Sequence, residues 1–331
     1  MTRELTEITV IGDDKTGIVA GVTSLLFERG VNIEDIDQAV QEGIFRMTLH
    51  ADTTEMVCTA DTLRDALEDL GDDLGVEIHV RFPADRETQR IAVLATKESH
   101  PLERLFEAWA NGDLGEGGAD VACVIANRPD LEPLADHYDV PFHDVGGEKG
   151  VPDEDDLLDL LAEYDVDLIV LGRYMRILGP EVVFRYEDRI INVHPSLLPA
   201  FPGAAAYRQA KEEGVRVAGV TAHYVTTDLD QGPIITQRAF NVPDDASLDD
   251  IRERGQPLEA EALLEAVRLH LDDAATVHRG RTSLRDDADE EAYQLGMDPE
   301  VDRINPDRPI DGKVDVLRGK EEKEAEAGAD D

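Results

Sequence analysis

The chain has 331 residues, 41% of them hydrophobic, which is enough for two domains with buried cores. Its formal net charge is −42, from 74 acidic and 32 basic residues, and this excludes nucleic acids and anionic membranes as favoured partners. Because molar salt shortens the Debye length to ~3 Å and screens self-repulsion, the composition predicts a halophilic protein, adapted to a salt-rich cytoplasm.

The two cysteines, Cys58 and Cys123, form no Cys-x-x-Cys pair, so the sequence indicates neither a disulfide framework nor a thiolate zinc site. No apolar run approaches ~18 residues, and no basic-then-apolar signal pattern opens the chain. We therefore expect a cytoplasmic protein without a membrane segment.

The first predicted domain spans residues 1–83. Hydrophobic periodicity predicts a helix after the turn at 13–17, a second helix at 59–74, and strands at 4–11, 31–40, 44–50 and 76–82. This βαββαβ order is the ferredoxin-like plan, which hosts many functions. Backbone N–H groups at the start of the first helix attract carboxylates, so the turn either meets a small zwitterion or is a plain tight turn.

A polar linker is predicted at 84–90, and a second domain at 91–285. Apolar strands and helices alternate there, with strands at 91–96, 119–125, 168–171 and 189–193 and helices at 102–111, 131–138 and 154–164. This pattern predicts a Rossmann-like α/β fold with a mostly parallel sheet covered on both faces.

Two later strands, at 216–224 and 234–241, flank a loop, and Ser247 to Asp250 predict a capping box that opens a C-terminal helix. Residues 286–331 are predicted to be an acidic, mobile tail, because their hydrophobicity is low.

Ligands of parallel sheets bind at the carboxyl ends of the strands, where residues 172–178, 192–203 and 223–233 emerge. Asn192 and His194 share a strand face, so an amide donor for an oxyanion lies beside a group that moves protons. Asp230 would orient a histidine or a water. These three residues suit attack on a carbonyl carbon. Because no Ser or Cys lies in a nucleophile elbow, the nucleophile is water or a second substrate.

Each of these residues also has a structural explanation, as a turn residue (Asn192, Asp230) or an interior histidine (His194). Their occurrence together at strand ends favours catalysis. A metal site built on His194 and His223 is disfavoured, because no third ligand has metal-type spacing. Ser99 and His100 either line the same crevice or begin a helix that Ser99 caps.

Three motifs resemble the folate-dependent formyltransferase family: Asn192-Val-His-Pro-Ser-Leu-Leu-Pro199, Gly219-Val-Thr-Ala-His223 and Asp228-Leu-Asp-Gln-Gly-Pro233. The resemblance implies that Asn192, His194 and Asp230 act on the formyl group of a reduced folate and that His223 supports them. It also implies folate-binding roles for a further set, in which the first four wrap the pterin and the last two belong to a loop that closes over it: Met175, Arg176, Ile177, Leu178, Thr226 and Asp228.

The first domain resembles an ACT domain, a module that commonly binds amino acids, and residues 16–19 fit its helix entry. An ACT domain before a formyltransferase domain is the layout of the formyltetrahydrofolate deformylase family, which residues 94–100, 168–175 and 221–226 also resemble. The resemblance implies hydrolysis of 10-formyltetrahydrofolate to formate and tetrahydrofolate, which supplies formate for purine synthesis and balances one-carbon pools. It implies no tightly bound cofactor, an effector such as glycine or methionine, and a homo-oligomer.

The sequence departs from that family at Pro195 and Leu197, where deformylases usually carry His and Phe. Residues 201–203 and 208–210 are more similar to glycinamide ribonucleotide transformylase, so formyl transfer to that ribonucleotide remains an alternative. Against it, the loop 96–100 has no glycine to cradle a phosphate, and Glu98 would repel one. A third alternative, a non-catalytic amino-acid or folate sensor, is disfavoured by the presence of Asn192, His194 and Asp230.

Overall fold

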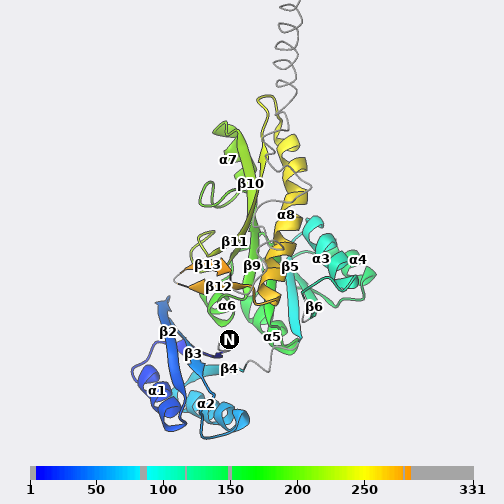
Figure 1. The fold of residues 1–331 in the computed structure, drawn as a ribbon. Coiled ribbons are helices and arrows are strands. Elements are labelled where there is room, and N and C mark those ends of the chain that lie inside the picture. Colours follow the sequence, from blue (N-terminus) through cyan, green and yellow to red (C-terminus); the bar gives the residue numbers. More distant parts are fainter. Residues whose placement is uncertain (1–4, 83–87, 116–117, 148–150, 279, 285–331) are drawn as a thin grey trace, which may run out of the picture.

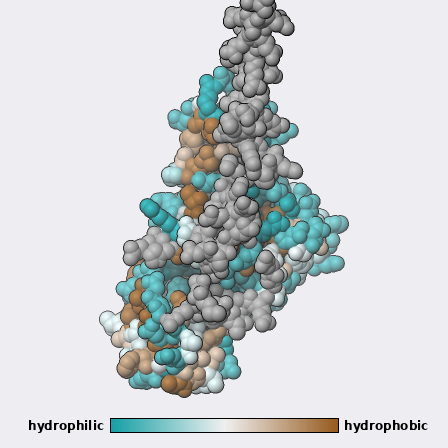
Figure 2. Space-filling model, in the orientation of Figure 1, coloured by the Kyte–Doolittle hydropathy of each residue, from teal (hydrophilic) through white to brown (hydrophobic). Residues whose placement is uncertain are grey.

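The computed structural model describes residues 5–82, 88–115, 118–147, 151–278 and 280–284. The predicted tail, and residues 84–87 of the predicted linker, lie outside these ranges. Figure 1 shows a small N-terminal domain beside a larger C-terminal one. Hydrophilic residues cover much of the visible face in Figure 2, in keeping with the high content of acidic residues.

The N-terminal domain has the predicted βαββαβ order. Its elements are β1 (Thr6–Asp13), α1 (Ile18–Glu28), β2 (Asn32–Gln41), β3 (Ile44–Asp52), α2 (Ala60–Leu74) and β4 (Val76–Arg81). The strands form an antiparallel sheet in the order β2-β3-β1-β4. Thr59 caps α2 by accepting a hydrogen bond from the Thr62 backbone N–H, and Gly75 ends the helix in the left-handed conformation that glycine adopts at little cost.

The C-terminal domain is built on a sheet of seven strands in the order β11-β10-β9-β8-β5-β6-β7. The five strands from β9 to β7 are parallel, and β10 is antiparallel to both neighbours, so the predicted mostly parallel α/β fold is confirmed. The elements up to β9 are β5 (Gln89–Ala95), α3 (His100–Ala110), β6 (Ala119–Ala126), α4 (Glu132–His137), β7 (Phe142–Asp144), α5 (Glu154–Glu163), β8 (Leu168–Gly172), α6 (Pro180–Arg185) and β9 (Ile190–His194).

The remaining elements are α7 (Ala206–Glu212), β10 (Val217–Tyr224), β11 (Ile234–Asn241), α8 (Leu248–Leu271), β12 (Ala275–His278) and β13 (Arg281–Leu284). The predicted capping box opens α8: the Asp250 N–H donates to Ser247 Oγ at 3.1 Å, and the Ser247 N–H donates to Asp250 Oδ2 at 2.7 Å. β5 begins two residues before the predicted position. The short elements β7, α6 and α7 were not expected, because three to seven residues carry too little periodicity to be recognised.

Alternate residues of the central strands fill two cores, one on each face of the sheet. Ile91 and Val93 of β5 pack with residues of α3 and α8, whereas Ala92 and Leu94 pack with residues of α5 and α6. Both faces are therefore covered, which explains why these strands read as continuous apolar runs. None of the helices within the described ranges has the length and hydropathy that a membrane-spanning segment needs.

The two domains meet where α6 and the turn after it contact β1 and β3. The side chain of Arg46 is only 5% exposed; it pairs with Glu187 of this turn, and its guanidinium lies 5.5 Å from the ring centre of Phe184. Three further ion pairs cross the boundary: Arg81–Asp167, Arg185–Glu77 and Arg189–Glu7. Since α6 directly precedes β9, the N-terminal domain is attached to the element that carries Asn192 and His194.

Asp188, in the same turn, makes this boundary sensitive to pH. Burial raises its pKa to about 6, and the Glu7 carboxylate adds to the rise. Because the folded protein binds this proton more tightly than the unfolded chain, the contribution to stability is present at low pH and is lost as the pH rises through about 6. Asp188→Asn, which tolerates the positive φ of 52°, is expected to remove the penalty of the buried charge.

The expected result is an increase in the free energy of unfolding of about 1 to 3 kcal/mol near pH ~7.5, and almost no change near pH ~4. Denaturant titrations at the two pH values measure it. An equal effect at both would contradict the assignment.

Candidate active site

The antiparallel pairing of β9 with β10 brings the predicted site residues together. Asn192 lies opposite His223, and His194 lies opposite Thr221. The alternate residues of β9, Ile191 and Val193, point into the core beneath α8, so the polar side chains of Asn192 and His194 share the other face. Asp230 reaches this face from the loop between β10 and β11, with its side chain 7% exposed.

His223 fixes the amide of Asn192. Its Nδ1 lies 2.8 Å from the backbone oxygen of Tyr224 and therefore carries the proton of the neutral ring. Burial lowers the pKa of His223, so the ring stays neutral near pH 7. Its Nε2 is then an acceptor for Asn192 Nδ2, at 3.2 Å. One amide hydrogen of Asn192 is held in this way, and the other can donate to a substrate oxygen.

Both ring nitrogens of His194 face hydrogen-bond acceptors. Nε2 lies 2.8 Å from the backbone oxygen of Phe201, and Nδ1 lies 3.2 Å from Asp230 Oδ2. A neutral imidazole has only one N–H donor. Both contacts are satisfied by an imidazolium beside an ionised Asp230, or by a neutral ring whose Nδ1 accepts from a protonated Asp230. The backbone N–H of Gly203 also donates to Asp230 Oδ2, at 2.7 Å. The site therefore presents a carboxyl group and an imidazole ring in contact with each other, beside a neutral amide donor.

The loop from Ser196 to Ala205 supplies two of these contacts, and buried hydrogen bonds hold it in place. Thr221 Oγ1 donates to the backbone oxygen of Ser196 at 2.7 Å and accepts from the Leu198 N–H at 3.0 Å. Phe201, at φ 55°, and Asp230, at φ 54°, occupy the left-handed region, which costs most residues about 1 kcal/mol. Strain of this kind persists where surrounding contacts enforce it, and it gathers at functional sites.

The predicted folate-binding residues divide into two groups. Met175, Arg176 and Ile177 are exposed beyond the carboxyl end of β8, and the Met175 N–H donates to Thr96 Oγ1 at 3.0 Å. Leu178 instead lies in the core beneath α6, 8% exposed, because the chain turns inward before that helix. This position argues against direct contact between Leu178 and a ligand.

In the loop after β10, Thr226 Oγ1 donates to the backbone oxygen of Asp228 at 3.3 Å, and the Asp228 side chain is exposed. Of the two alternatives for Ser99 and His100, the structure shows the start of a helix: Ser99 is at the N-cap position of α3, although its side chain makes no capping hydrogen bond. Its neighbour His100 turns toward α8, where Nε2 lies 3.3 Å from Glu259. Among the described residues, no group of three or more His, Cys, Asp or Glu side chains is arranged to hold a metal ion.

The sequence interpretation missed several parts of the site. The backbone oxygen of Phe201 and the backbone N–H of Gly203 contact His194 and Asp230, but main-chain groups leave no signature in residue types. Thr221 is fully buried on the face of β10 that also carries His223. Thr221 could have been found from the sequence, because it lies two positions before His223 and therefore on the same face of the strand.

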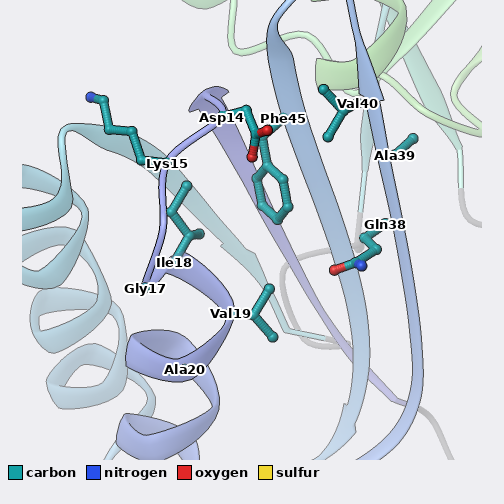
Figure 3. Close-up of a pocket in the computed structure, with 10 residues that line it drawn as sticks. All are labelled: Asp14, Lys15, Gly17, Ile18, Val19, Ala20, Gln38, Ala39, Val40 and Phe45. Carbon is teal, nitrogen blue, oxygen red and sulfur yellow. The ribbon is translucent and has the colours of Figure 1, made fainter.

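A hollow of about 490 Å³ lies in the N-terminal domain, between the β1–α1 turn and β2 (Figure 3). Lys15, Gly17, Gln38 and Phe45 are among its lining residues. Gly17, at φ 99°, begins α1 without a side-chain cap, so the first N–H groups of the helix lack the usual capping partner. The predicted turn at 13–17 thus borders a cavity large enough for a small molecule.

Comparison with known proteins agrees with the two-domain architecture. Residues 89–267 match the family described as Formyl transferase, and residues 6–81 match the ACT domain family. A formyl transferase domain that carries an ACT domain at its N-terminus is therefore the class of protein that the fold and the site define. Formyltetrahydrofolate deformylase of Bacillus subtilis is 36% identical over 274 residues, which are 81% of this chain and 90% of that protein.

Solved structures of similar proteins agree with this class. A formyltetrahydrofolate deformylase from Pseudomonas syringae has a TM-score of 0.58 and 30% identity, and the match covers 86% of this chain and 96% of that one. A glycinamide ribonucleotide transformylase from Symbiobacterium toebii has a TM-score of 0.56 and 35% identity, and covers 60% of this chain and 95% of that one. The chain belongs to the formyltetrahydrofolate deformylase family.

Proposed function

We propose that the protein hydrolyses 10-formyltetrahydrofolate to formate and tetrahydrofolate. The observation that carries this proposal is the convergence of Asn192, His194 and Asp230, with the ion pair of His194 and Asp230 at 3.2 Å beside an amide donor that His223 orients. Such a set suits a reaction that passes through a tetrahedral oxyanion.

In the proposed reaction, a water molecule adds to the formyl carbon and Asp230 accepts its proton. The free amide hydrogen of Asn192 and the positive ring of His194 stabilise the negative oxygen of the intermediate. The C–N bond then breaks as the folate nitrogen takes up a proton delivered by His194, and formic acid leaves and releases its remaining proton to solvent as formate. Asp230 returns its proton to His194, directly or through water.

Exposed apolar side chains near the site fit a flat pterin ring. Met175 is 53% exposed and Ile177 74% in the segment after β8, and Leu229, beside Asp230, is 49% exposed. A ligand that covers these side chains removes apolar surface from water, which favours binding at roughly 25 cal/mol per Å². Binding there also excludes bulk water from the reacting carbon.

Transfer of the formyl group to glycinamide ribonucleotide is the second candidate. Pro195, Leu197 and the similarity to solved transformylases over 60% of the chain favour it. Two features favour water as the acceptor. The loop from Thr96 to His100 offers a phosphate no glycine and carries Glu98. The deformylase relatives share both domains, whereas the transformylases match only the second.

Formate release decides between the two candidates. Purified protein in molar KCl is expected to release formate from 10-formyltetrahydrofolate at the same rate with and without glycinamide ribonucleotide. Strict dependence of folate turnover on the ribonucleotide would support the formyltransferase and contradict the proposed hydrolase. Absence of turnover under both conditions would favour a sensor.

We further propose that an amino acid, such as glycine or methionine, binds in the hollow beside Gly17. The free N–H groups at the start of α1 suit its carboxylate, and Asp14, which also lines the hollow, suits its ammonium group. Gly17→Gln, which places a side chain in this wall and strains a backbone with φ 99°, is expected to abolish the effect of the amino acid on kcat and leave basal turnover intact. Calorimetric binding that survives the change would contradict the assignment.

The net charge of −42 supports a salt-rich cytoplasm as the environment in which the protein works. The formate that it releases would serve purine synthesis and the balance of one-carbon pools. The unfolding midpoint is expected to rise steeply from dilute buffer to molar KCl, because salt screens the repulsion between acidic side chains. A midpoint that does not depend on salt would contradict this adaptation.

We also propose that the protein forms a homo-oligomer. Several large hydrophobic side chains of the N-terminal domain are exposed, including Phe27 at 82% and Val57 at 74%. Burying them between copies would stabilise an assembly. Light scattering in molar salt tests this, and a monomeric mass would contradict it.

A further inference from the structure

A buried carboxylate joins four elements behind the site. Glu259 of α8 has a side chain that is 1% exposed. Its Oε1 accepts a hydrogen bond from Tyr207 Oη at 2.6 Å. Its Oε2 lies 3.3 Å from His100 Nε2 and 3.5 Å from Arg173 Nε. These partners come from α7, the start of α3 and the residue after β8.

The partners keep Glu259 ionised. Burial alone would raise its pKa, but the hydrogen bond from His100, the charge of Arg173 and the hydroxyl of Tyr207 together hold the pKa below its usual value. A buried carboxylate is retained only where its charge is paired and its oxygens accept hydrogen bonds. Gly255 of α8 leaves room for the Tyr207 hydroxyl. A Cβ at this position would lie 2.0 Å from Tyr207 Oη, so any other residue would collide with it.

One partner anchors the loop that holds the catalytic groups. Tyr207 lies two residues after Ala205, whose φ of 60° is in the left-handed region. The preceding loop gives the Phe201 oxygen to His194 and the Gly203 N–H to Asp230. The bond between Tyr207 and Glu259 fixes the end of this loop and opposes relaxation of the strained backbone.

A second partner anchors the segment after β8. Arg173 has a φ of 62°, a strained conformation for a residue with a Cβ, and its side chain points to Glu259. The exposed residues Met175 to Ile177 follow directly. Because Arg173 sets the direction in which this segment leaves the sheet, its pairing with Glu259 fixes the position of the apolar side chains proposed to meet the pterin.

We infer that Glu259 is a positioning residue, which sets the geometry of the catalytic loop through Tyr207 and that of the folate segment through Arg173. The inference rests on the proposed function for its assay. It assigns separate effects to the two contacts: Tyr207 governs kcat, and Arg173 governs the affinity for folate.

The test compares Tyr207→Phe, Glu259→Gln and a matched control. Glu265→Gln changes a partly buried carboxylate of α8, which pairs with Arg238 at 2.7 Å and accepts from Thr236 at 3.1 Å, both on β11. Each variant is assayed for kcat and KM in molar KCl, per mole of folded protein, and its Kd for a reduced folate is measured by fluorescence titration.

Tyr207→Phe is expected to lower kcat about tenfold with KM and Kd unchanged, because a misplacement of catalytic groups by ~1 Å can cost ~10²-fold and the loss of this hydrogen bond should cause a smaller one. Glu259→Gln is expected to lower kcat at least as far and to raise Kd about tenfold, since Arg173 is released as well. Glu265→Gln should retain the wild-type kcat and Kd.

Wild-type kcat and Kd in folded Tyr207→Phe and Glu259→Gln proteins would overturn the inference and reduce the cluster to a structural role. If Glu259→Gln fails to fold, the kcat of Tyr207→Phe and the Kd of Arg173→Gln decide. A wild-type protein that releases no formate contradicts the proposed function instead, and the Kd values still test the positioning of the folate segment.

Discussion

Replacing Asp230 with Asn is expected to reduce kcat by about 10³- to 10⁴-fold while folate still binds. The amide is nearly the same size as the carboxylate but accepts no proton from water and carries no charge to hold the His194 imidazolium. The Gly203 N–H, 2.7 Å from Asp230 Oδ2, can still donate to the amide oxygen, so the loop should keep its position.

Formate release measures kcat, and fluorescence titration with folate measures binding. Asp249→Asn, at an exposed position in the first turn of α8, is a suitable control for the loss of one negative charge. A near-normal rate in Asp230→Asn would remove Asp230 from the mechanism, and loss of folate binding would turn it into a binding residue.

Replacing Asn192 with Asp is expected to lower kcat by about 10²- to 10³-fold, the usual cost of losing one oxyanion donor. The carboxylate has no hydrogen to offer the formyl oxygen and places negative charge where the intermediate develops it. It also faces His223 Nε2, which is an acceptor at 3.2 Å from the native amide nitrogen. The repulsion favours protonation of His223 and opposes the effect of burial, which lowers its pKa in the native protein.

The variant should therefore show a pH–rate profile whose acid limb is shifted to higher pH relative to wild type. Measurements of kcat across the pH range test both the expected loss of kcat and the expected shift of the acid limb. A kcat within threefold of wild type (roughly 0.6 kcal/mol) would show that Asn192 is not the oxyanion donor.

Much of this site followed from residue types and spacing. Asn192 and His194 were expected on one face because they are two residues apart in an apolar strand, and β9 places them so. Asp230 was expected near them because its loop was taken to follow a strand that ends at the same edge of the sheet. Asp230 does lie 3.2 Å from His194, but that reason was wrong: β10 runs antiparallel to β9, and its carboxyl end lies beside Ile191. Parallel-sheet topology therefore accounts for Asn192 and His194 at the end of β9, but not for Asp230, whose strand is antiparallel.

Contacts that depend on tertiary folding could not be found in this way. Glu259 lies in a helix whose neighbouring residues, Ala260, Ala262 and Leu263, indicate only a core-facing surface, and its partners are far away in the sequence. Leu178 was assigned to the ligand with its exposed neighbours, yet it packs under α6, a helix too short to be recognised. The ion pair of Arg46 with Glu187 joins two domains whose relative placement no sequence periodicity encodes.

The central claim is that water accepts the formyl group, and an isotope experiment tests it most directly. Turnover of 10-formyltetrahydrofolate in molar KCl is carried out in water labelled with heavy oxygen, without any added amine, and the formate is analysed by mass spectrometry. One labelled oxygen atom per formate released is expected, because one oxygen comes from water and the other from the formyl group. Unlabelled formate, or no formate until glycinamide ribonucleotide is added, would contradict the account.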